Sequence, residues 1–400
     1  MTNLEIRPLT AGDDLDAQRD LGERAFGAMS PAERDGWRRS TLLRVTGGRF
    51  LGAFLDGRPV GAASYHDMRQ WWAGRELPMA GVASVKIAPQ ARGQGLGRAL
   101  MTEQLRQIAD RGYPLSALYP ATMPIYRSLG WELAGGRYHV VIPSRSLRSL
   151  VPPDAAITGD VPAIPALRPV APRDAAGVIS VLGRVHQAAG DCGPTTRDLA
   201  SVQDWLAHGD EYRYIGDDAF ISYEWQPDNE GLYARWAVAG SAGSQRALWS
   251  LLAGHSSTAD TVEVRTSPDS PVWWLLRERD ARLVKRSMWM LRVIDAKAAI
   301  EGRGFPPGVH VSARLTVADE ILLANDGTWR FSVADGKAAL DRTADDPAAL
   351  TMGPRGLAAL YAGTPVSTLR LAGLATGGTP NDDAALAAAF TGTAFMLDDF

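Results

Sequence analysis

A glycine-rich segment that ends at Arg98 combines residue types that can hold phosphate groups. Gly93, Gly95 and Gly97 occupy alternate positions, so backbone N–H groups can reach a ligand without side chains in the way. Apolar residues recur at helical spacing, at Leu96, Leu100, Leu105 and Ile108. The segment therefore leads into a helix N-terminus with its partial positive charge, and Arg92 and Arg98 add permanent charge. The pattern predicts a phosphate site; a glycine-rich turn without a ligand is the alternative.

The spacing distinguishes this segment from two other phosphate loops. A dinucleotide-binding loop would need glycine at Arg98, and a P-loop would need Gly-Lys-Ser/Thr, which the sequence lacks. Instead, an Arg-x-x-Gly-x-Gly pattern begins at Arg92, after a strand-like stretch at residues 81–88 that contains Val85-Lys86-Ile87. Strand, arginine and glycines together resemble the signature of GNAT-type N-acetyltransferases. In that family the loop holds the pyrophosphate of coenzyme A.

A tyrosine follows the next expected strand, residues 115–119. Thr122 suits the N-cap of a short helix, and Pro124 suits its first turn. Tyr126 is then followed by Gly130-Trp131, which resembles the GNAT pattern in which a tyrosine hydroxyl reaches the sulfur of coenzyme A. A phenol with a pKa of about 10 can protonate a departing thiolate. Packing of Tyr126 between helix and sheet, without a chemical role, is the alternative.

The chain contains a weak internal repeat at an offset of about 150 residues, which is one domain length. Leu167-Arg168-Pro169 matches Ile6-Arg7-Pro8, and an amphipathic helix is expected after each, at residues 174–189 and 14–29. Residues 276–283 likewise echo residues 126–133. A duplicated domain is the prediction, and chance similarity is the alternative.

The second copy lacks the residues that could hold a cofactor. Its loop, residues 241–248, does not have the glycine spacing, and Leu276 replaces Tyr126. We therefore expect the second copy to keep the fold without a cofactor site.

Two proline-rich segments divide the chain, a linker at residues 151–165 and a boundary near residues 302–308. The expected domains are residues 1–150, 151–296 and 297–400. For the last domain the patterns predict strands at 309–315, 320–324 and 329–333, a turn at 325–327, and helices at 354–362 and 383–390. The fold class is α+β, with two tandem GNAT-like α/β domains before a smaller α+β domain.

The composition excludes other classes of protein. The chain has 400 residues, 46% of them hydrophobic, and its net charge of −3 provides no basic field for nucleic acid. The N-terminus does not resemble a signal peptide, and no apolar run is long enough to cross a membrane. Cys192 is the only cysteine and the six histidines are scattered. We therefore expect no disulfide, no metal, no nucleic acid partner and no membrane insertion, and a reducing, cytoplasmic setting.

Over essentially the whole chain, the first-domain motifs, the degenerate repeat, the smaller third domain and the terminal phenylalanine resemble the Eis ("enhanced intracellular survival") family. The resemblance implies a third domain like sterol carrier protein, a homohexamer built from two trimers, and acetyl transfer from acetyl-CoA to amines of polyamine or aminoglycoside-like molecules. It implies Tyr126 as general acid and the Phe400 carboxylate as general base. The cofactor contacts that it implies are Val85, Lys86, Ile87, Arg92, Gly93, Gln94, Gly95, Leu96, Gly97, Arg98, Ala121 and Thr122. A lipid- or small-molecule-binding protein with a regulatory or vestigial acetyl-CoA site is the alternative from another class.

The expected substrate pocket departs from the family. Members that act on polycationic antibiotics carry acidic residues in a first-domain helix, whereas residues 26–29 here have none. We expect an aromatic wall of Phe26 and Trp37, with negative charge supplied by Asp399 and its neighbour Asp398. Trp71 and Trp72, expected in an exposed loop, would extend this wall or pack at a subunit contact.

The last seven residues, 394–400, form an apolar and acidic run. We expect this run to reach the first domain and to bring the α-carboxylate of Phe400 to the substrate amine, which must lose a proton. An α-carboxyl group is ionised at neutral pH, and apolar surroundings raise its pKa toward that of a useful base. A Phe400 side chain that only anchors the chain end, with its carboxylate in solvent, is the alternative.

Overall fold

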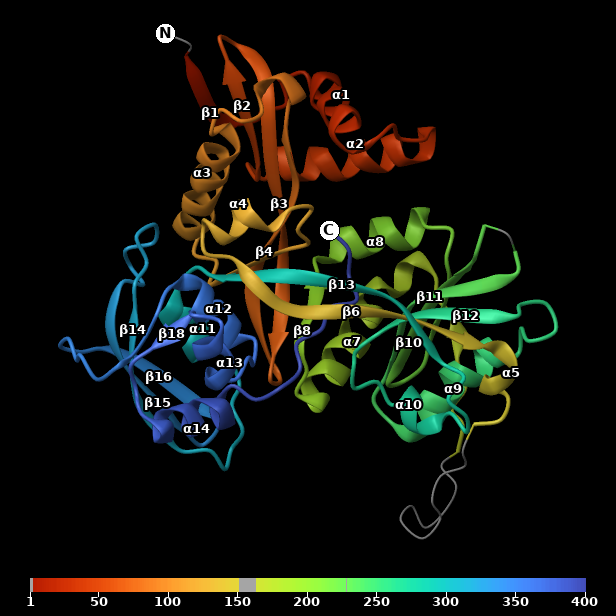
Figure 1. Ribbon diagram of the computed structural model, residues 1–400. Helices are drawn as coiled ribbons and strands as arrows, with labels where there is room; N and C mark the ends of the chain where they lie inside the picture. The colour runs from red at the N-terminus through yellow and green to blue at the C-terminus, as the bar shows by residue number, and fades with distance from the viewer. Residues whose placement is uncertain (1–2, 151–162, 228) are drawn as a thin grey trace.

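The computed structural model describes residues 3–150, 163–227 and 229–400. A large mixed sheet runs through both repeats, and a smaller sheet belongs to the last part of the chain (Figure 1). Of the expected linker at residues 151–165, residues 151–162 lie outside the described residues.

The first repeat opens with a strand and two capped helices. The Asp14 side chain caps α1, and Ser30 and Glu33 form a capping box at the start of α2. Helices α1 and α2 cover one face of the strands and α3 covers the other (Figure 1). The elements are β1 (Leu4–Pro8), α1 (Leu15–Phe26), α2 (Pro31–Thr46), β2 (Phe50–Leu55), β3 (Arg58–Trp72), β4 (Arg75–Ile87), η1 (Pro89–Ala91), α3 (Leu96–Asp110), β5 (Leu115–Leu118), α4 (Met123–Arg127), β6 (Glu132–Pro143) and α5 (Ser144–Leu147).

The second repeat has the same alternation of strands and helices. Its elements are β7 (Arg168–Pro169), η2 (Pro172–Asp174), α7 (Ala175–Ala189), β8 (Cys192–Arg197), α8 (Leu199–His208), β9 (Tyr212–Ile215), β10 (Ala219–Trp225), β11 (Gly231–Ala239), α9 (Ala242–Ala253), β12 (Thr261–Thr266), α10 (Val272–Leu275) and β13 (Arg282–Val293).

Strand β13 joins the two repeats into one sheet. It comes from the second repeat but lies antiparallel between β5 and β6 of the first, and β6 pairs with β12 on its other side. The sheet order is β1-β2-β3-β4-β5-β13-β6-β12-β11-β10-β9-β7, with β8 paired to β3. Neighbouring strands in space therefore come from both sides of residue 150.

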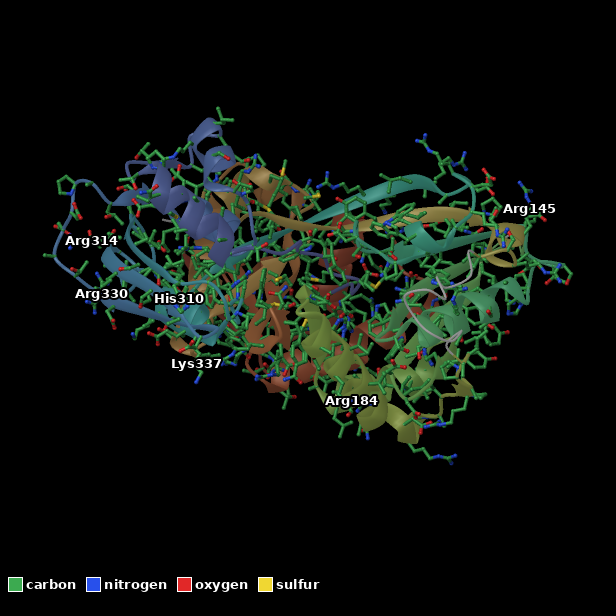
Figure 2. The ribbon with its side chains drawn as sticks, turned by 90° about the horizontal axis from the view of Figure 1, so that it is seen from below. Arg145, Arg184, His310, Arg314, Arg330 and Lys337 are labelled. Atoms are coloured by element: carbon green, nitrogen blue, oxygen red, sulfur yellow. The ribbon has the colours of Figure 1, made fainter. Side chains whose placement is uncertain are left out.

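The last part of the chain forms its own sheet, in the order β16-β15-β14-β17-β18. Its elements are α11 (Ala296–Gly302), β14 (Val311–Val317), β15 (Gly327–Ala334), β16 (Lys337–Arg342), β17 (Leu350–Met352), α12 (Pro354–Tyr361), α13 (Val366–Leu371), β18 (Ala375–Thr376) and α14 (Pro380–Ala389). The exposed basic side chains of His310, Arg314, Arg330 and Lys337 lie on the outer side of this domain, at the far end of the molecule from Arg145 (Figure 2).

Two local expectations are wrong. Residues 320–324 form turns and not a strand, because Asp319 accepts hydrogen bonds from the backbone N–H groups of Ile321 and Leu322 and bends the chain. Trp71 and Trp72 end strand β3 and are buried, at 8% and 0% exposure, so they do not lie in an exposed loop. The Trp72 ring packs on those of Trp289 and Tyr361, in the core shared with the last domain.

Candidate active site

Strands β4 and β5 separate soon after they pair. They run parallel only from Met79 to Gly81 in β4, and β4 then continues to Ile87 without β5 beside it. A β-bulge lies in the part of β4 that has no partner in β5. On the β3 side, Ala62 pairs with Lys86 while Ser64 pairs with Ala83, and Ser84 has a φ of +56°. Bulges of this kind redirect a strand and release backbone groups from the ladder. The first repeat therefore offers free backbone groups at the opening between two strands.

The glycine loop continues from this opening into α3. Gly93 and Gly95 both have a φ of +77°, and a Cβ atom at either position would meet nothing within 4 Å. Arg92 and Arg98 are exposed; Arg98 is oriented by a 2.7 Å hydrogen bond to the Ser128 hydroxyl. Bare backbone at a helix N-terminus, with two guanidinium groups beside it, fits the pyrophosphate of coenzyme A.

Gly97 has a different role, because it lies in the first turn of α3 against α4. A Cβ atom there would lie 3.1 Å from the Ile125 side chain, so glycine permits the close approach of the two helices.

The structure divides the other expected cofactor contacts between backbone and side chain. The Lys86 side chain turns away and donates a 2.7 Å hydrogen bond to the Gln18 carbonyl; burial, with a contribution from Arg44, lowers its pKa to about 8. Lys86 can therefore offer only its backbone to a cofactor. Ala121 and Thr122 are exposed just before α4, and the Thr122 hydroxyl makes no capping hydrogen bond.

Tyr126 lies in α4 and is 6% exposed. Its ring packs edge-on against Trp131 at 6.4 Å between ring centroids, within the apolar core of the first repeat. Burial raises the pKa of Tyr126 to about 12, because the phenolate would lose its hydration. The hydroxyl is therefore protonated at neutral pH and can act only as a proton donor until it has given that proton up.

The chain end reaches the first repeat along a path lined by three glycines. A Cβ atom on Gly135 or Gly193 would overlap the backbone of the last seven residues. A Cβ atom on Gly81 would lie 3.0 Å from the Phe400 ring. The Phe400 ring also lies 5.8 Å from that of Tyr119, between centroids. The terminal phenylalanine thus lies where β4 and β5 begin to separate.

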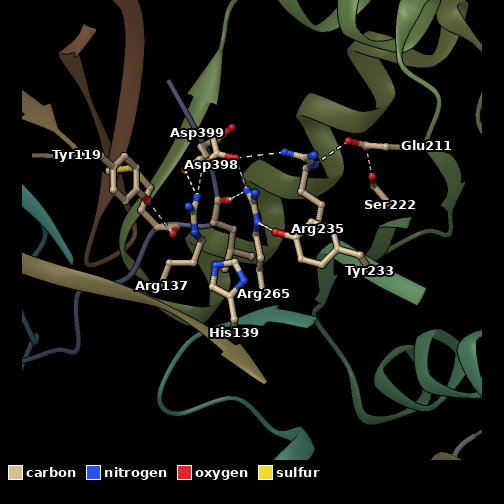
Figure 3. A network of polar contacts seen from close by, with 12 residues as sticks. Tyr119, Arg137, His139, Glu211, Ser222, Tyr233, Arg235, Arg265, Asp398 and Asp399 are labelled. Atoms are coloured by element: carbon tan, nitrogen blue, oxygen red, sulfur yellow. Dashed lines mark hydrogen bonds and ion pairs between the residues drawn. The ribbon is translucent and has the colours of Figure 1, made fainter. Parts of the chain in front are cut away.

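Arginines hold the backbone and the charge of this chain end (Figure 3). Arg137 donates to the Asp398 carbonyl at 2.9 Å, and Arg265 donates to the Leu397 carbonyl at 3.0 Å. The Asp399 carboxylate pairs with Arg137, with Arg265 at 2.6 Å and with Arg235 at 3.1 Å. Burial opposes ionisation of Asp399, but the guanidinium groups of Arg265 and Arg137 outweigh it and lower the pKa of Asp399. The negative charge beside Phe400 is therefore compensated within the protein.

The expected substrate wall is only partly assembled. Phe26 ends α1 with 61% of its surface exposed, and Trp37 packs against the small apolar cluster around Phe50. In the described part of the chain, neither ring lines a cavity of about 270 Å³ that Arg197 lines, or a cavity of about 290 Å³ at the chain end. Asp399 does line the second of them, with Trp205.

The second repeat repeats the strand pair but not the loop. β11 and β12 run parallel over only Gly231–Ala234 and Thr261–Val264, and the parallel pairing of β4 with β5 is similarly short. Helix α9 then begins at Ala242, so only Gly240 and Ser241 separate it from β11. A loop with alternating glycines has no counterpart there.

Two absences concern the described residues as a whole. No helix in residues 3–150, 163–227 and 229–400 combines the length and apolar character needed to cross a membrane. The same residues contain no group of three metal-binding side chains.

Comparison with known families agrees with this architecture. Residues 5–134 and 196–293 each match a family described as an acetyltransferase (GNAT) domain, and residues 296–397 match a sterol carrier protein domain. The fold and the site therefore define a GNAT-type N-acetyltransferase with a sterol-carrier-like third domain.

Individual relatives narrow the class. The chain is 30% identical to the N-acetyltransferase Eis of Mycobacterium tuberculosis over 349 aligned residues. The alignment covers 84% of this chain and 83% of the relative. It is 28% identical to an uncharacterized N-acetyltransferase of Streptomyces avermitilis, over 93% of this chain and 92% of the relative. The chain belongs to the Eis family of N-acetyltransferases.

Solved structures show the same fold. A GCN5-related N-acetyltransferase from Kribbella flavida superposes with a TM-score of 0.91 at 38% identity, over 100% of this chain and 99% of that one. Eis1 from Mycobacterium abscessus has a TM-score of 0.78 at 23% identity over the full length of both chains, which supports the fold alone.

Sequence reasoning missed the arginines that hold the chain end. Arg137 lies within β6 and Arg265 within β12, and both are buried. An arginine within an expected strand is a detectable signal, because its charge, if buried, must meet a carboxylate or carbonyl group in the fold. Its partner, residues 397–399, is too distant in sequence to be assigned without the structure.

Proposed function

We propose that this protein transfers the acetyl group of acetyl-CoA to an amine of a small molecule by direct attack on the thioester. The new C–N bond forms as the C–S bond breaks; the thiolate takes one proton, and the attacking nitrogen loses another. The observation that carries the proposal is that three features meet at β4: the glycine loop follows it, Tyr126 shares an apolar core with it, and the Phe400 ring lies at Gly81, where β5 separates from it. Acetyl-CoA supplies the acetyl group and leaves as the free thiol.

Tyr126 is proposed as the general acid. Its side chain is buried among apolar groups with its pKa raised to about 12, so it holds its proton at neutral pH. The same loss of hydration raises the basicity of a thiolate that develops beside it, and the thiolate can then take that proton.

The α-carboxylate of Phe400 is proposed as the general base. The ring of Phe400 packs beside Gly81 and Tyr119, and the residues before it are fixed by backbone hydrogen bonds, such as that from the Tyr119 hydroxyl to the Met396 carbonyl at 3.2 Å. A base must be held within hydrogen-bond reach of the proton that it accepts, directly or through one water. A chain end that is fixed in this way holds its carboxylate in one position, as a general base requires.

We expect amidation of the Phe400 carboxylate to lower turnover at least about tenfold, because it removes the base and keeps the side chain. A short extension after Phe400 should have the same effect, because it moves the charge away. Steady-state turnover measures the effect, and acetyl-CoA affinity should stay unchanged. The control is the same semisynthetic protein with a free carboxylate. Full activity of the amidated protein would assign the base to another group.

The acceptor is proposed to be a small molecule with a primary amine. Polyamine and aminoglycoside-like amines are the acceptors that the family suggests, and the sequence predicts that Asp399 attracts them. Asp399 is held by Arg137, Arg235 and Arg265, so its charge is already neutralised. The attraction of a polycation therefore needs another source in this chain.

We also propose a homohexamer of two trimers in the cytoplasm, by analogy with the family. Light scattering should then give a mass of about six times 42.9 kDa. A monomer at micromolar concentration would remove this part of the proposal and leave the chemistry of the site unaffected.

A further inference from the structure

A cavity of about 270 Å³ lies between α2, β3 and the start of α8, and its lining is rich in basic groups. Arg44 comes from α2, Arg49 from the turn after it, and Arg197 from the end of β8. His66 and Met68 of β3 also line it.

This cavity adjoins the proposed active site at three points. The sulfur of Met68 and the ring of Phe400 both approach Gly81, at 2.8 and 3.0 Å from where its Cβ atom would be. Arg197 donates to the Asp399 carbonyl. The Arg44 guanidinium donates at 3.3 Å to the hydroxyl of Ser84, the residue at the β4 bulge. An acceptor in the cavity would therefore lie next to both the chain end and the bulge.

Arg44 is a buried cation without a counter-charge. It is 5% exposed, and its hydrogen bonds go to neutral groups: the hydroxyls of Thr41, Ser64 and Ser84 and the Ser40 carbonyl. Among the described residues it makes no ion pair with a carboxylate. Burial, with Arg49 nearby, lowers its pKa to about 10, which leaves it charged at neutral pH. A buried charge of this kind is stable when an anion joins it.

The other two arginines of the cavity are already matched by carboxylates. Arg49 pairs with Asp67 at 3.3 Å, and Arg197 pairs with Asp398 at 3.3 Å. Asp198 caps α8 by accepting the Ser201 backbone N–H at 3.0 Å and keeps its negative charge. Among the described residues, Arg44 is therefore the arginine of the cavity lining that pairs with no carboxylate.

His66 responds to burial and to the same three arginines. Burial, followed by the charges of Arg44, Arg197 and Arg49, holds its pKa well below the usual range. His66 is therefore neutral at physiological pH and neither cancels nor adds to the positive charge.

We propose that the acceptor carries a carboxylate close to its amine and that Arg44 binds this carboxylate. Four of the five N–H groups of Arg44 already donate to the neutral groups named above, and the remaining N–H on Nη2 can donate a charge-assisted hydrogen bond to a carboxylate. The cavity admits only a small molecule, and the three arginines of its lining disfavour a polycation. This inference rests on the proposed acetyl transfer and specifies its acceptor as an amino-acid-type molecule.

The test compares acceptors that differ only by a carboxylate, with the wild-type protein and acetyl-CoA. Lysine is compared with 1,5-diaminopentane, and alanine with ethylamine, by release of free thiol. We expect kcat/KM to be at least about tenfold higher for the member with the carboxylate, as a buried charged hydrogen bond allows.

A variant pair then assigns the preference to one residue. Arg44→Gln should bring the ratio of kcat/KM within each pair of acceptors close to one. Arg39→Gln should leave the ratio unchanged, because Arg39 lies on the same helix but pairs with Asp204 outside the cavity, at 3.2 Å.

The outcomes separate the two proposals. If the enzyme is active and its kcat/KM for the diamine equals or exceeds that for lysine, the carboxylate inference is overturned and acetyl transfer stands. If no acceptor in either pair or in a wider amine panel supports thiol release, that result would contradict acetyl transfer itself. The comparison in the wild-type protein decides the matter even if Arg44→Gln does not fold.

Discussion

Replacement of Tyr126 by phenylalanine should lower kcat by about 10²–10⁴-fold, which is the contribution typical of general acid catalysis. The hydroxyl has no hydrogen-bond partner among the described residues, and apolar packing against Trp131 holds the ring. Phenylalanine keeps that packing, so neither the fold nor acetyl-CoA affinity should change. Steady-state kinetics and calorimetry with acetyl-CoA measure the two quantities separately.

The matched control is Tyr65→Phe, which removes a hydroxyl from the same apolar cluster on strand β3. It should leave kcat within about twofold of wild type, since it does not touch the proposed proton path. Near-normal turnover of Tyr126→Phe would reduce Tyr126 to a packing residue. Equal losses in both variants would point to the cluster's stability and not to proton transfer.

Replacement of Gly95 by glutamate should abolish acetyl-CoA binding. The position faces open space at the N-terminus of α3, where the pyrophosphate is proposed to lie, so a carboxylate there would meet like charge. We expect no binding heat in calorimetry up to millimolar acetyl-CoA.

Gly57→Glu controls for the backbone effect of this change. Gly57 lies in the turn between β2 and β3 and has the same φ of +77°, and a Cβ atom there would likewise meet nothing within 4 Å. Its substitution adds the same strain and charge away from the loop and should leave acetyl-CoA affinity unchanged. Retained binding by Gly95→Glu, or two equivalents of acetyl-CoA bound per wild-type chain, would contradict the assignment of a single loop as the cofactor site.

The elements that carry short motifs could be predicted from the sequence. The strand with Val85, the glycine loop and the helix after it follow from local spacing, and the structure has them at β4, residues 92–95 and α3. Local patterns suffice here because glycine spacing and helical periodicity report on neighbouring residues.

Long-range arrangements could not be predicted in the same way. The insertion of β13 between β5 and β6 depends on pairing between residues that are far apart in the chain. The sequence of β13 would look the same if this strand paired only within its own repeat. Arg44 is a comparable case, because an arginine in α2 reads as a solvent-facing residue until its burial beside Ser64 and Ser84 is seen. The proposed binding of the acceptor at Arg44 could therefore be inferred only from the structure.

The most direct test of the central claim is the stoichiometry of the reaction. The wild-type protein is incubated with acetyl-CoA and a panel of small amines, and free thiol and N-acetylated product are quantified together, the latter by mass spectrometry. We predict one N-acetyl group for each thiol released, at a rate that depends on the amine and falls in the Tyr126→Phe variant. Acetyl-CoA that binds but is not consumed above the amine-free background, across the whole panel, would contradict the account and favour a binding protein with a vestigial cofactor site.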